Sequence, residues 1–357
     1  MTATLPRRPA GRPPAVAVPP GHSMLGPVLV HRRGLVTVVG LLVVLGAVVA
    51  ISLAVGSVRI DPLRAVGAVF GTGTPRDLLV VGQLRLPRVE AGLAVGIALG
   101  LSGCLMQTLA RNRLATPETT GLNNGATAFA VASVVSVPMS LAPPAMALTG
   151  AATAAALTLG LSGGAGPRGY RFLVVGLGLG AVSGAVTNLL LARADIDTAN
   201  AAMPWTVGTL NTTTGPAVRL LELGLLVGLP TAVLLGRWLR ALRFPDAVAT
   251  GLGVPLGRAR IAVLLTSVGA AGLSVAVAGP LGMVALAAPE AARRLTGPGP
   301  VPVVASALTG AVFTLLADLV GRMAFAPLEI PAGLVTAVVG GPYLLWLLLT
   351  TRTRTTP

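Results

Sequence analysis

The residues of this chain that could do chemistry are mostly arginines, joined by a few carboxylates. Arg85 and Arg88 are three positions apart and Asp318 precedes Arg322 by four, so each pair would share one helix face. Arginine is a planar fork that can bind a carboxylate through two hydrogen bonds. Arg85 and Arg88 could instead lie at a membrane interface with their stems on apolar surface. Asp318 could be a structural partner of Arg322 or a coupling-ion or proton site.

The residue types that are missing exclude several chemistries. All 26 basic residues are arginine, so neither the lysine of a P-loop nor a Schiff base is available. The two histidines, His22 and His31, precede the first apolar run, and Cys104 is the only cysteine. We therefore expect no catalytic residue, no metal site and no cofactor in this chain. If ATP drives the protein, another chain must bind it.

The overall composition predicts an integral membrane protein. Hydrophobic residues make up 54% of the 357 and charged residues only 10%, against about 25% in a soluble domain. The 46 glycines and the 3% aromatic content favour closely packed helices over a β-barrel. The net charge of +15 then indicates a bias between the two membrane sides, with no nucleic acid as partner.

Apolar runs of about 20 residues predict an all-α, polytopic bundle of ten membrane spans. The predicted spans are 34–57, 86–110, 120–138, 142–162, 171–193, 217–236, 259–280, 281–296, 301–324 and 333–350. Segment 281–296 is too short to cross upright, and 58–77 is expected to lie on the surface. The Pro- and Arg-rich segment 1–33 is expected to be a disordered cytosolic tail, with a second tail at 351–357. The permease domain would be 34–350, with a cytosolic loop at 237–258.

Arginine placement orients the predicted bundle. With both termini in the cytoplasm, 18 arginines lie inside and 8 outside, as the positive-inside rule requires. Arg85 and Arg88 are among five arginines in the first outer loop, an excess that needs a reason. Glycines repeat every fourth residue at 92–100 and again at 176–184, which predicts two ridges for close helix packing.

Three stretches resemble the FecCD permease family, which forms the membrane subunits of ABC importers for ferric siderophores, haem and vitamin B12. The first runs from Leu84-Arg85-Leu86-Pro87-Arg88 to Arg111-Asn112-Arg113-Leu114-Ala115, and the second is Trp205-Thr206-Val207-Gly208-Thr209-Leu210. The third joins Gly279-Pro280-Leu281-Gly282, Ala317-Asp318, Glu329-Ile330-Pro331-Ala332-Gly333 and Gly340-Gly341-Pro342. The resemblance covers about 34–350, and the order and spacing of its motifs make it specific.

The resemblance implies a ten-span type II ABC importer permease in the plasma (inner) membrane. It would pair with an identical or different second permease, two ATP-binding subunits that hold ATP and Mg, and an extracytoplasmic binding protein. We expect a ferric siderophore as cargo. Haem or cobalamin import is the alternative within the family, and an ion-coupled secondary carrier using Asp318 and Glu222 is the alternative outside it.

The family also implies roles for particular residues. Arg85, Arg88 and Arg322 would receive acidic residues of the binding protein. Asp246, Ala249, Leu252 and Gly253 would belong to short coupling helices that contact the ATPase, unless the loop is simply a basic cytosolic one. Pro245-Asp246 itself is typical of a helix start.

Asn112 and Leu114 match a turn that helps form the cytoplasmic gate, although an ordinary turn explains them as well. Three positions depart from the family pattern: Arg113 replaces a usual Pro, Glu290 a usual His and Glu118 a common Gly. We expect Glu290 to pair with Arg293 and Arg294 and assign it no further role.

The translocation pathway is the feature that the sequence specifies least. Ser183, Thr187 and Asn188 fall roughly on one helix face and are candidates to line it. The same hydroxyl and amide groups serve equally well as hydrogen bonds between helices.

Overall fold

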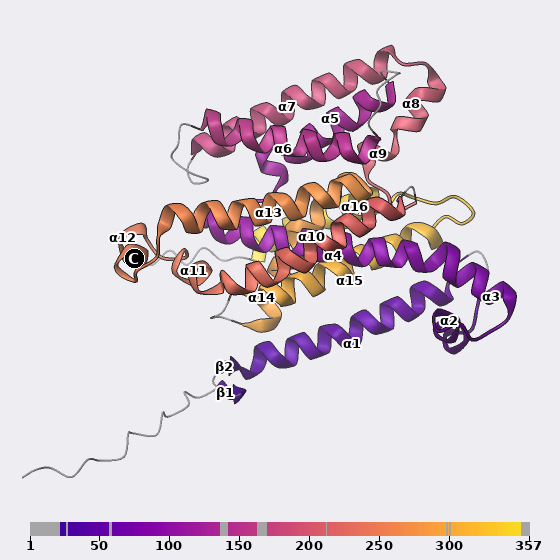
Figure 1. Ribbon diagram of the computed structural model, residues 1–357, viewed down its shortest axis with the longest axis horizontal. Helices are drawn as coiled ribbons and strands as arrows, with labels where there is room; N and C mark the ends of the chain where they lie inside the picture. The colour runs from indigo at the N-terminus through magenta and orange to yellow at the C-terminus, as the bar shows by residue number, and fades with distance from the viewer. Residues whose placement is uncertain are drawn as a thin grey trace, which may run out of the picture.

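The computed structural model is a bundle of helices that run side by side along its long axis (Figure 1). It describes residues 22–25, 28–56, 59–135, 142–162, 170–211, 213–297, 299 and 301–350. The predicted tail at 351–357 and most of the predicted tail at 1–33 therefore lie outside the described residues. Inside segment 1–33, where we expected disorder, β1 (His22–Leu25) pairs with β2 (Val28–His31) as an antiparallel hairpin.

Each of the ten predicted spans coincides with one helix. These are α1 (Arg32–Ala54), α4 (Leu86–Ala110), α5 (Leu122–Val135), α6 (Pro143–Leu161), α7 (Tyr170–Arg193), α10 (Gly215–Leu234), α13 (Leu256–Ala278), α14 (Gly282–Thr296), α15 (Val303–Met323) and α16 (Ala332–Thr350). Seven of the described helices are long and apolar enough to cross a membrane. The other three, α5, α14 and α16, do not meet that criterion. Helix α14 has 15 residues, and its sequence predicts this short length.

Short helices connect the long ones. They are α2 (Pro62–Val69), α3 (Pro75–Leu79), η1 (Val80–Arg85), η2 (Glu118–Thr120), α8 (Ile196–Ala202), α9 (Pro204–Val207), α11 (Gly236–Ala241) and α12 (Asp246–Gly251). Asp61 caps α2 by accepting from the amide of Leu63, and Thr74 caps α3 in a capping box with Asp77. Helices α2 and α3 lie at one end of the bundle and α11 and α12 at the other (Figure 1).

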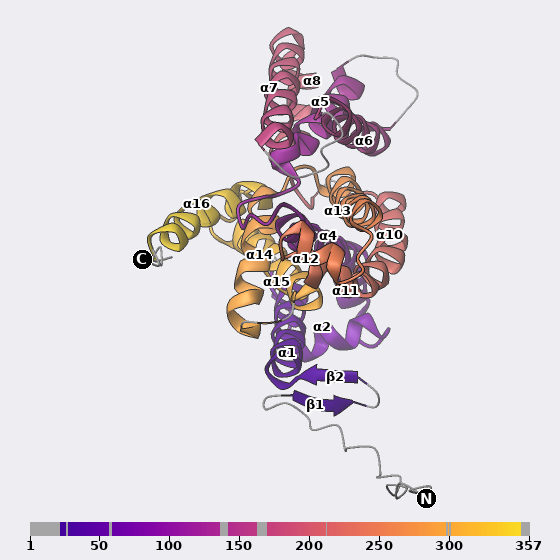
Figure 2. The ribbon, with the colours of Figure 1, turned by 90° about the vertical axis from the view of Figure 1, so that its left-hand side faces the viewer.

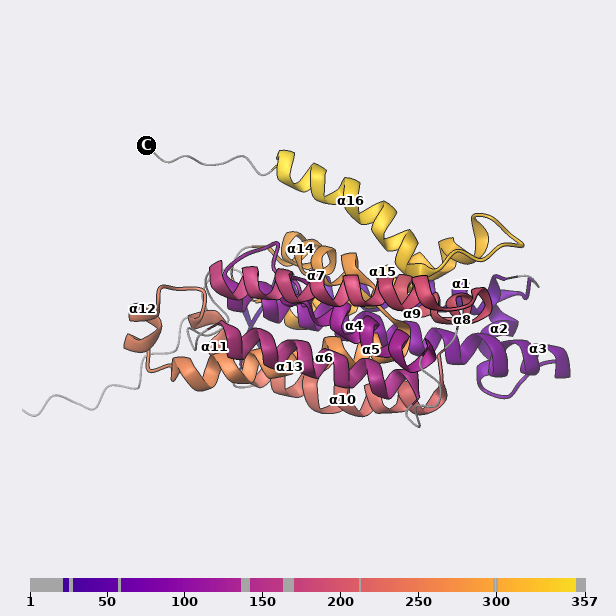
Figure 3. The same cartoon turned by 90° about the horizontal axis from the view of Figure 1, so that it is seen from above.

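Helix α4 lies at the centre of the bundle, and its residues are therefore buried on nearly every side. It packs against α15, α13, α14 and α10. Helices α5, α6 and α7 form a second group on one side of this core, and α1 lies on the opposite side (Figures 1 and 2). Helix α16 leans away from the bundle (Figure 3).

The first glycine ridge makes a close contact between α4 and α15. A Cβ at Gly96 would fall 2.5 Å from the Cα of Ala311, and one at Gly100 would fall 2.1 Å from the carbonyl oxygen of Ser306. In return, a Cβ at Gly310 on α15 would fall 2.1 Å from the carbonyl oxygen of Gly96. Only glycine lets the two backbones come this close, so the prediction of a packing ridge on α4 is confirmed.

Candidate functional site

The three arginines predicted for docking lie together at the α2 end. Arg88 donates to Asp318 over 2.9 Å, to Glu329 over 3.0 Å and to Asn211 over 3.3 Å. Arg322 pairs with the second carboxylate oxygen of Asp318 at 3.0 Å, which confirms the predicted pair on one helix face. Asp318 thus joins two guanidinium groups from α4 and α15.

Arg85 is the most deeply placed of the three. It ends η1, where the widened helical turn aims it at the end of α1, and it donates to the carbonyl of Leu53 over 2.6 Å. The neighbouring Gly56 leaves room for it, since a Cβ there would meet the guanidinium at 2.9 Å. Arg85 is therefore held inside the chain.

A cavity of about 760 Å³ opens beside this cluster, and Arg59, Arg85, Arg88, Arg322 and Glu329 all line it. The structure brings the three predicted residues to one cavity, as an acidic partner would need. The structure also shows that each of the three side chains already has a partner within the chain, which the sequence did not indicate for all of them. Arg59, which is exposed, is the lining arginine that sequence reasoning left out.

The predicted coupling segment forms the two short helices α11 and α12 at the other end. Asp246 opens α12, as its position after Pro245 predicts, and pairs with Arg111 at 3.0 Å and with Arg260. Ala249 is completely buried within the chain, whereas Leu252 is 63% exposed. Leu252 is therefore the predicted coupling residue with an apolar side chain that another protein can reach, and Phe244 and Val248 of the same segment are exposed as well.

The predicted gate turn follows α4 directly. Arg111 ends the helix in the left-handed conformation, with φ at 51°, and the side chain of Asn112 accepts from the amide of Leu114 over 2.9 Å. This side-chain bond shapes the turn although the usual proline is replaced by Arg113. Leu114 is exposed beside it.

A second cavity, of about 570 Å³, contains two of the three predicted pathway residues. Thr187 and Asn188 line it, and Ser183 instead accepts from Thr187 through its backbone carbonyl at 3.0 Å. The opposite wall comes from η2 and α5, with Glu118, Asn123, Asn124 and Thr127. The lining is therefore polar.

Glu118 is the residue of this cavity that sequence reasoning passed over. It accepts from the side-chain amide of Asn123 over 2.9 Å, and burial raises its pKa to about 7. Gly282 makes space for it, because a Cβ there would fall 2.1 Å from the Glu118 Oε1 atom. The sequence offered two weak signals for this residue, which are the replacement of a common family Gly by Glu118 and an asparagine five positions later.

The fold and these sites define a multi-pass helical membrane protein with an internal polar cavity. The sequence matches the FecCD transport family over residues 41–350. The chain therefore belongs to the FecCD transport family, as its motifs indicated.

Curated relatives are similar over nearly the whole chain. The achromobactin transport system permease protein CbrC of Dickeya dadantii is 37% identical, over 87% of this chain and 90% of its own. The ferric enterobactin permease protein FepG of Escherichia coli is 35% identical, over 90% of this chain and 98% of its own. The Fe(3+)-citrate import permease protein YfmE of Bacillus subtilis is 35% identical, over 89% and 96%.

Among solved structures, an inward-facing metal-chelate type ABC transporter has the same fold. It superposes with a TM-score of 0.78 at 24% identity and covers 87% of this chain and 98% of its own.

Proposed function

We propose that this chain is the permease subunit of a binding-protein-dependent ABC importer that moves a ferric siderophore inward. The observation that carries the proposal is the FecCD family match over 41–350, with relatives named for achromobactin and ferric enterobactin. A separate subunit would hydrolyse ATP, which agrees with a chain that has no lysine for a P-loop. Haem and cobalamin are the alternative cargoes.

The two ends of the bundle fit the two partners of such an importer. The α2 end would receive the binding protein, whose carboxylates would meet Arg85, Arg88 and Arg322 at the 760 Å³ cavity. The α12 end would sit on the ATPase through Leu252 and its neighbours. Asn112 and Leu114 would belong to the cytoplasmic gate. The chain would lie in the plasma membrane with both termini on the cytoplasmic side, an orientation that places most of its arginines in the cytoplasm.

The polar cavity of Glu118 and Asn188 would face the pathway. Hydroxyl and amide groups there can exchange hydrogen bonds with a siderophore without fixing it by charge. Two permease subunits would enclose the complete path, and selectivity would lie mainly with the binding protein.

An ion-coupled carrier is the competing function, and the placement of its key residue speaks against it. Asp318 is buried and bound by both Arg88 and Arg322, so its carboxylate is already neutralised by two cations. A coupling ion would have to displace a guanidinium group. Glu222, the second candidate, lies on the exposed surface of α10.

Reconstitution with the cognate ATPase and binding protein in proteoliposomes tests the proposal. Uptake of ⁵⁵Fe-siderophore should require ATP and the binding protein, and should stop when the catalytic glutamate of the ATPase is replaced by glutamine. Unlabelled siderophore should compete, whereas haem and cobalamin should not. Uptake by the permease alone under an ion gradient would overturn the proposal in favour of a carrier.

A further inference from the structure

The α12 end holds a cavity of about 580 Å³, and Asn112 is the only one of its described lining residues with a predicted role. Six arginines line it, from four separate segments of the chain: Arg33, Arg111 with Arg113, Arg243, and Arg293 with Arg294. Glu290 is the only carboxylate among the described lining residues. The cavity is therefore strongly basic.

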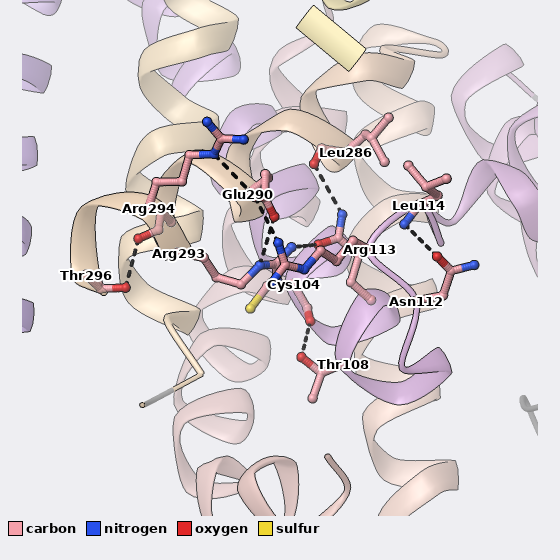
Figure 4. Close-up of polar contacts among 12 residues, drawn as sticks. Cys104, Thr108, Asn112, Arg113, Leu114, Leu286, Glu290, Arg293, Arg294 and Thr296 are labelled. Carbon is pink, nitrogen blue, oxygen red and sulfur yellow. Dashed lines mark hydrogen bonds and ion pairs between the residues drawn. The ribbon is translucent and has the colours of Figure 1, made fainter. Parts of the chain in front are cut away.

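Glu290 is shared among three of these arginines. Arg113 and Arg293 each approach it at 3.3 Å and Arg294 at 3.4 Å, which confirms the predicted local pairing with the last two (Figure 4). The third partner of Glu290, Arg113, is distant in the sequence, so only the tertiary structure reveals this ion pair. The two positions where this chain departs from the Pro and His of its family thus meet and pair with each other.

Neutral oxygen acceptors bind at least three of the six guanidinium groups. Arg33 donates to the carbonyl of Leu295 over 3.1 Å, Arg243 to that of Gly299, and Arg293 to the side chain of Gln107. Carbonyl and amide oxygens orient a guanidinium group and leave its charge uncompensated. Arg111 also pairs with Asp246, which is not among the described lining residues. Glu290 and Asp246 together cannot balance six guanidinium charges, so the site keeps an excess of positive charge.

Position and shape indicate which anion would fit. The cavity lies where α1 and α15 begin and α4 and α14 end, at the boundary between the apolar bundle and water. Basic pockets between membrane helices at this depth suit phosphate headgroups. A phosphoryl group also offers several oxygens to several guanidinium groups at once, which a single carboxylate does not.

We propose that this arginine cavity binds a phosphoryl anion, with Arg113 and Arg294 as its exposed ligands and Glu290 as the carboxylate that pairs with both of them when the anion is absent. The anion could be the headgroup of an anionic phospholipid or a free phosphate compound. The proposal requires only that the bundle spans the membrane, so it does not depend on which chelate is transported.

The test uses the full chain purified with its ATPase. Bound phosphatidylglycerol is counted by native mass spectrometry, and inorganic pyrophosphate affinity is measured by titration calorimetry. The variant carries Arg113→Ala and Arg294→Ala. Its matched control carries Arg237→Ala and Arg240→Ala, which removes two exposed arginines from the same end but outside the cavity.

We expect the cavity variant to lose about tenfold in affinity for one of the two probes, because charge-assisted hydrogen bonds are lost, while the control keeps it. Loss of lipid alone identifies a headgroup, and loss of pyrophosphate alone identifies a soluble anion. Glu290→Gln, which removes the competing charge and keeps the side-chain shape, should bind the same probe more tightly.

Equal binding of both probes by the cavity variant and its control would overturn the proposal. So would a cavity variant that loses only its ATPase on purification, since the arginines would then be a subunit contact. Unfolding temperatures of all variants, measured in the same detergent, show that each is folded when it is compared.

Discussion

At the α2 end, Arg85 is buried, Arg88 and Arg322 are partly buried, and all three are bonded to carboxylates or backbone carbonyls of the chain. At the α12 end, six arginines line a cavity whose described lining holds one carboxylate, Glu290. The residue type is the same, but the balance of charge differs. A buried guanidinium needs a partner inside the chain, because removing it from water is costly. A guanidinium at an open cavity can leave part of its bonding to a ligand. The first arrangement stabilises the fold, and the second leaves the chain ready to bind.

Replacement of Asp318 should have the largest effect on the free energy of unfolding and so tests the difference between the two ends most directly. Asp318→Asn leaves Arg88 and Arg322 buried without a carboxylate between them, so we expect a loss of about 3–5 kcal/mol in the free energy of unfolding. Asp246→Asn at the other end removes a half-exposed carboxylate and should cost less than about 1 kcal/mol. Denaturant unfolding in detergent measures both. Equal losses would show that the two ends do not differ in this way.

Reversal of the docking charges should have the next largest effect. Arg85→Glu with Arg88→Glu should reduce binding-protein-stimulated ATPase activity by about tenfold or more, because charge-assisted pairs with the partner become repulsive. Since both side chains are also bonded within the chain, Arg59→Glu is the cleaner companion. It alters the exposed charge of the same cavity with no buried bond lost. Stimulation that survives all three changes would argue against docking at this end.

The position of the ATPase contact can be determined by comparing substitutions at a buried and at an exposed residue of α12 and the turn that follows it. Leu252→Glu should weaken ATPase binding several-fold while the permease keeps its unfolding temperature, because Leu252 is exposed. Ala249→Glu should lower the unfolding temperature itself, because it forces a charge into a filled site. Co-purification and thermal unfolding separate the two effects. A stable Ala249→Glu protein that loses its ATPase would place the contact at Ala249 instead.

The last prediction concerns Glu118, a carboxyl whose cavity has no arginine among its described lining residues. Its pKa of about 7 lies above the ordinary 4.5, so the folded state holds a proton that the unfolded state releases between these values. The free energy of unfolding should therefore fall as pH rises from about 4.5 to 7. Glu118→Gln should flatten this slope, measured by unfolding at several pH values. An unchanged slope would assign the pH dependence to another group.

Much of this molecule was predictable because its signals are local. A run of apolar residues must become a helix in a membrane, where each backbone group needs a partner within its own segment, so all ten predicted spans coincide with helices. The helix start at Asp246 and the pair of Asp318 with Arg322 are also local, being set by neighbouring positions on one helix. The glycine repeat of α4 predicted a close contact for the same reason.

Other features depended on segments far apart in the chain. Nothing near Arg88 in the sequence indicates that it shares Asp318 with Arg322, which lies more than two hundred positions away. The placement of Glu118 in a cavity with Asn188 and the pairing of Arg113 with Glu290 likewise need α4, α7 and α14 to be assembled first.

The sequence by itself determined the membrane class, the helices and the family, because hydropathy, periodicity and motif spacing act along the chain. Only the tertiary structure decided which arginines are already neutralised and which keep an unbalanced charge. Electrostatic energy depends on distance in space and on burial, and neither can be obtained from position in the sequence. That is why the sequence did not indicate that Arg85 and Arg88 are bonded within the chain, and why it did not predict the basic cavity at the other end.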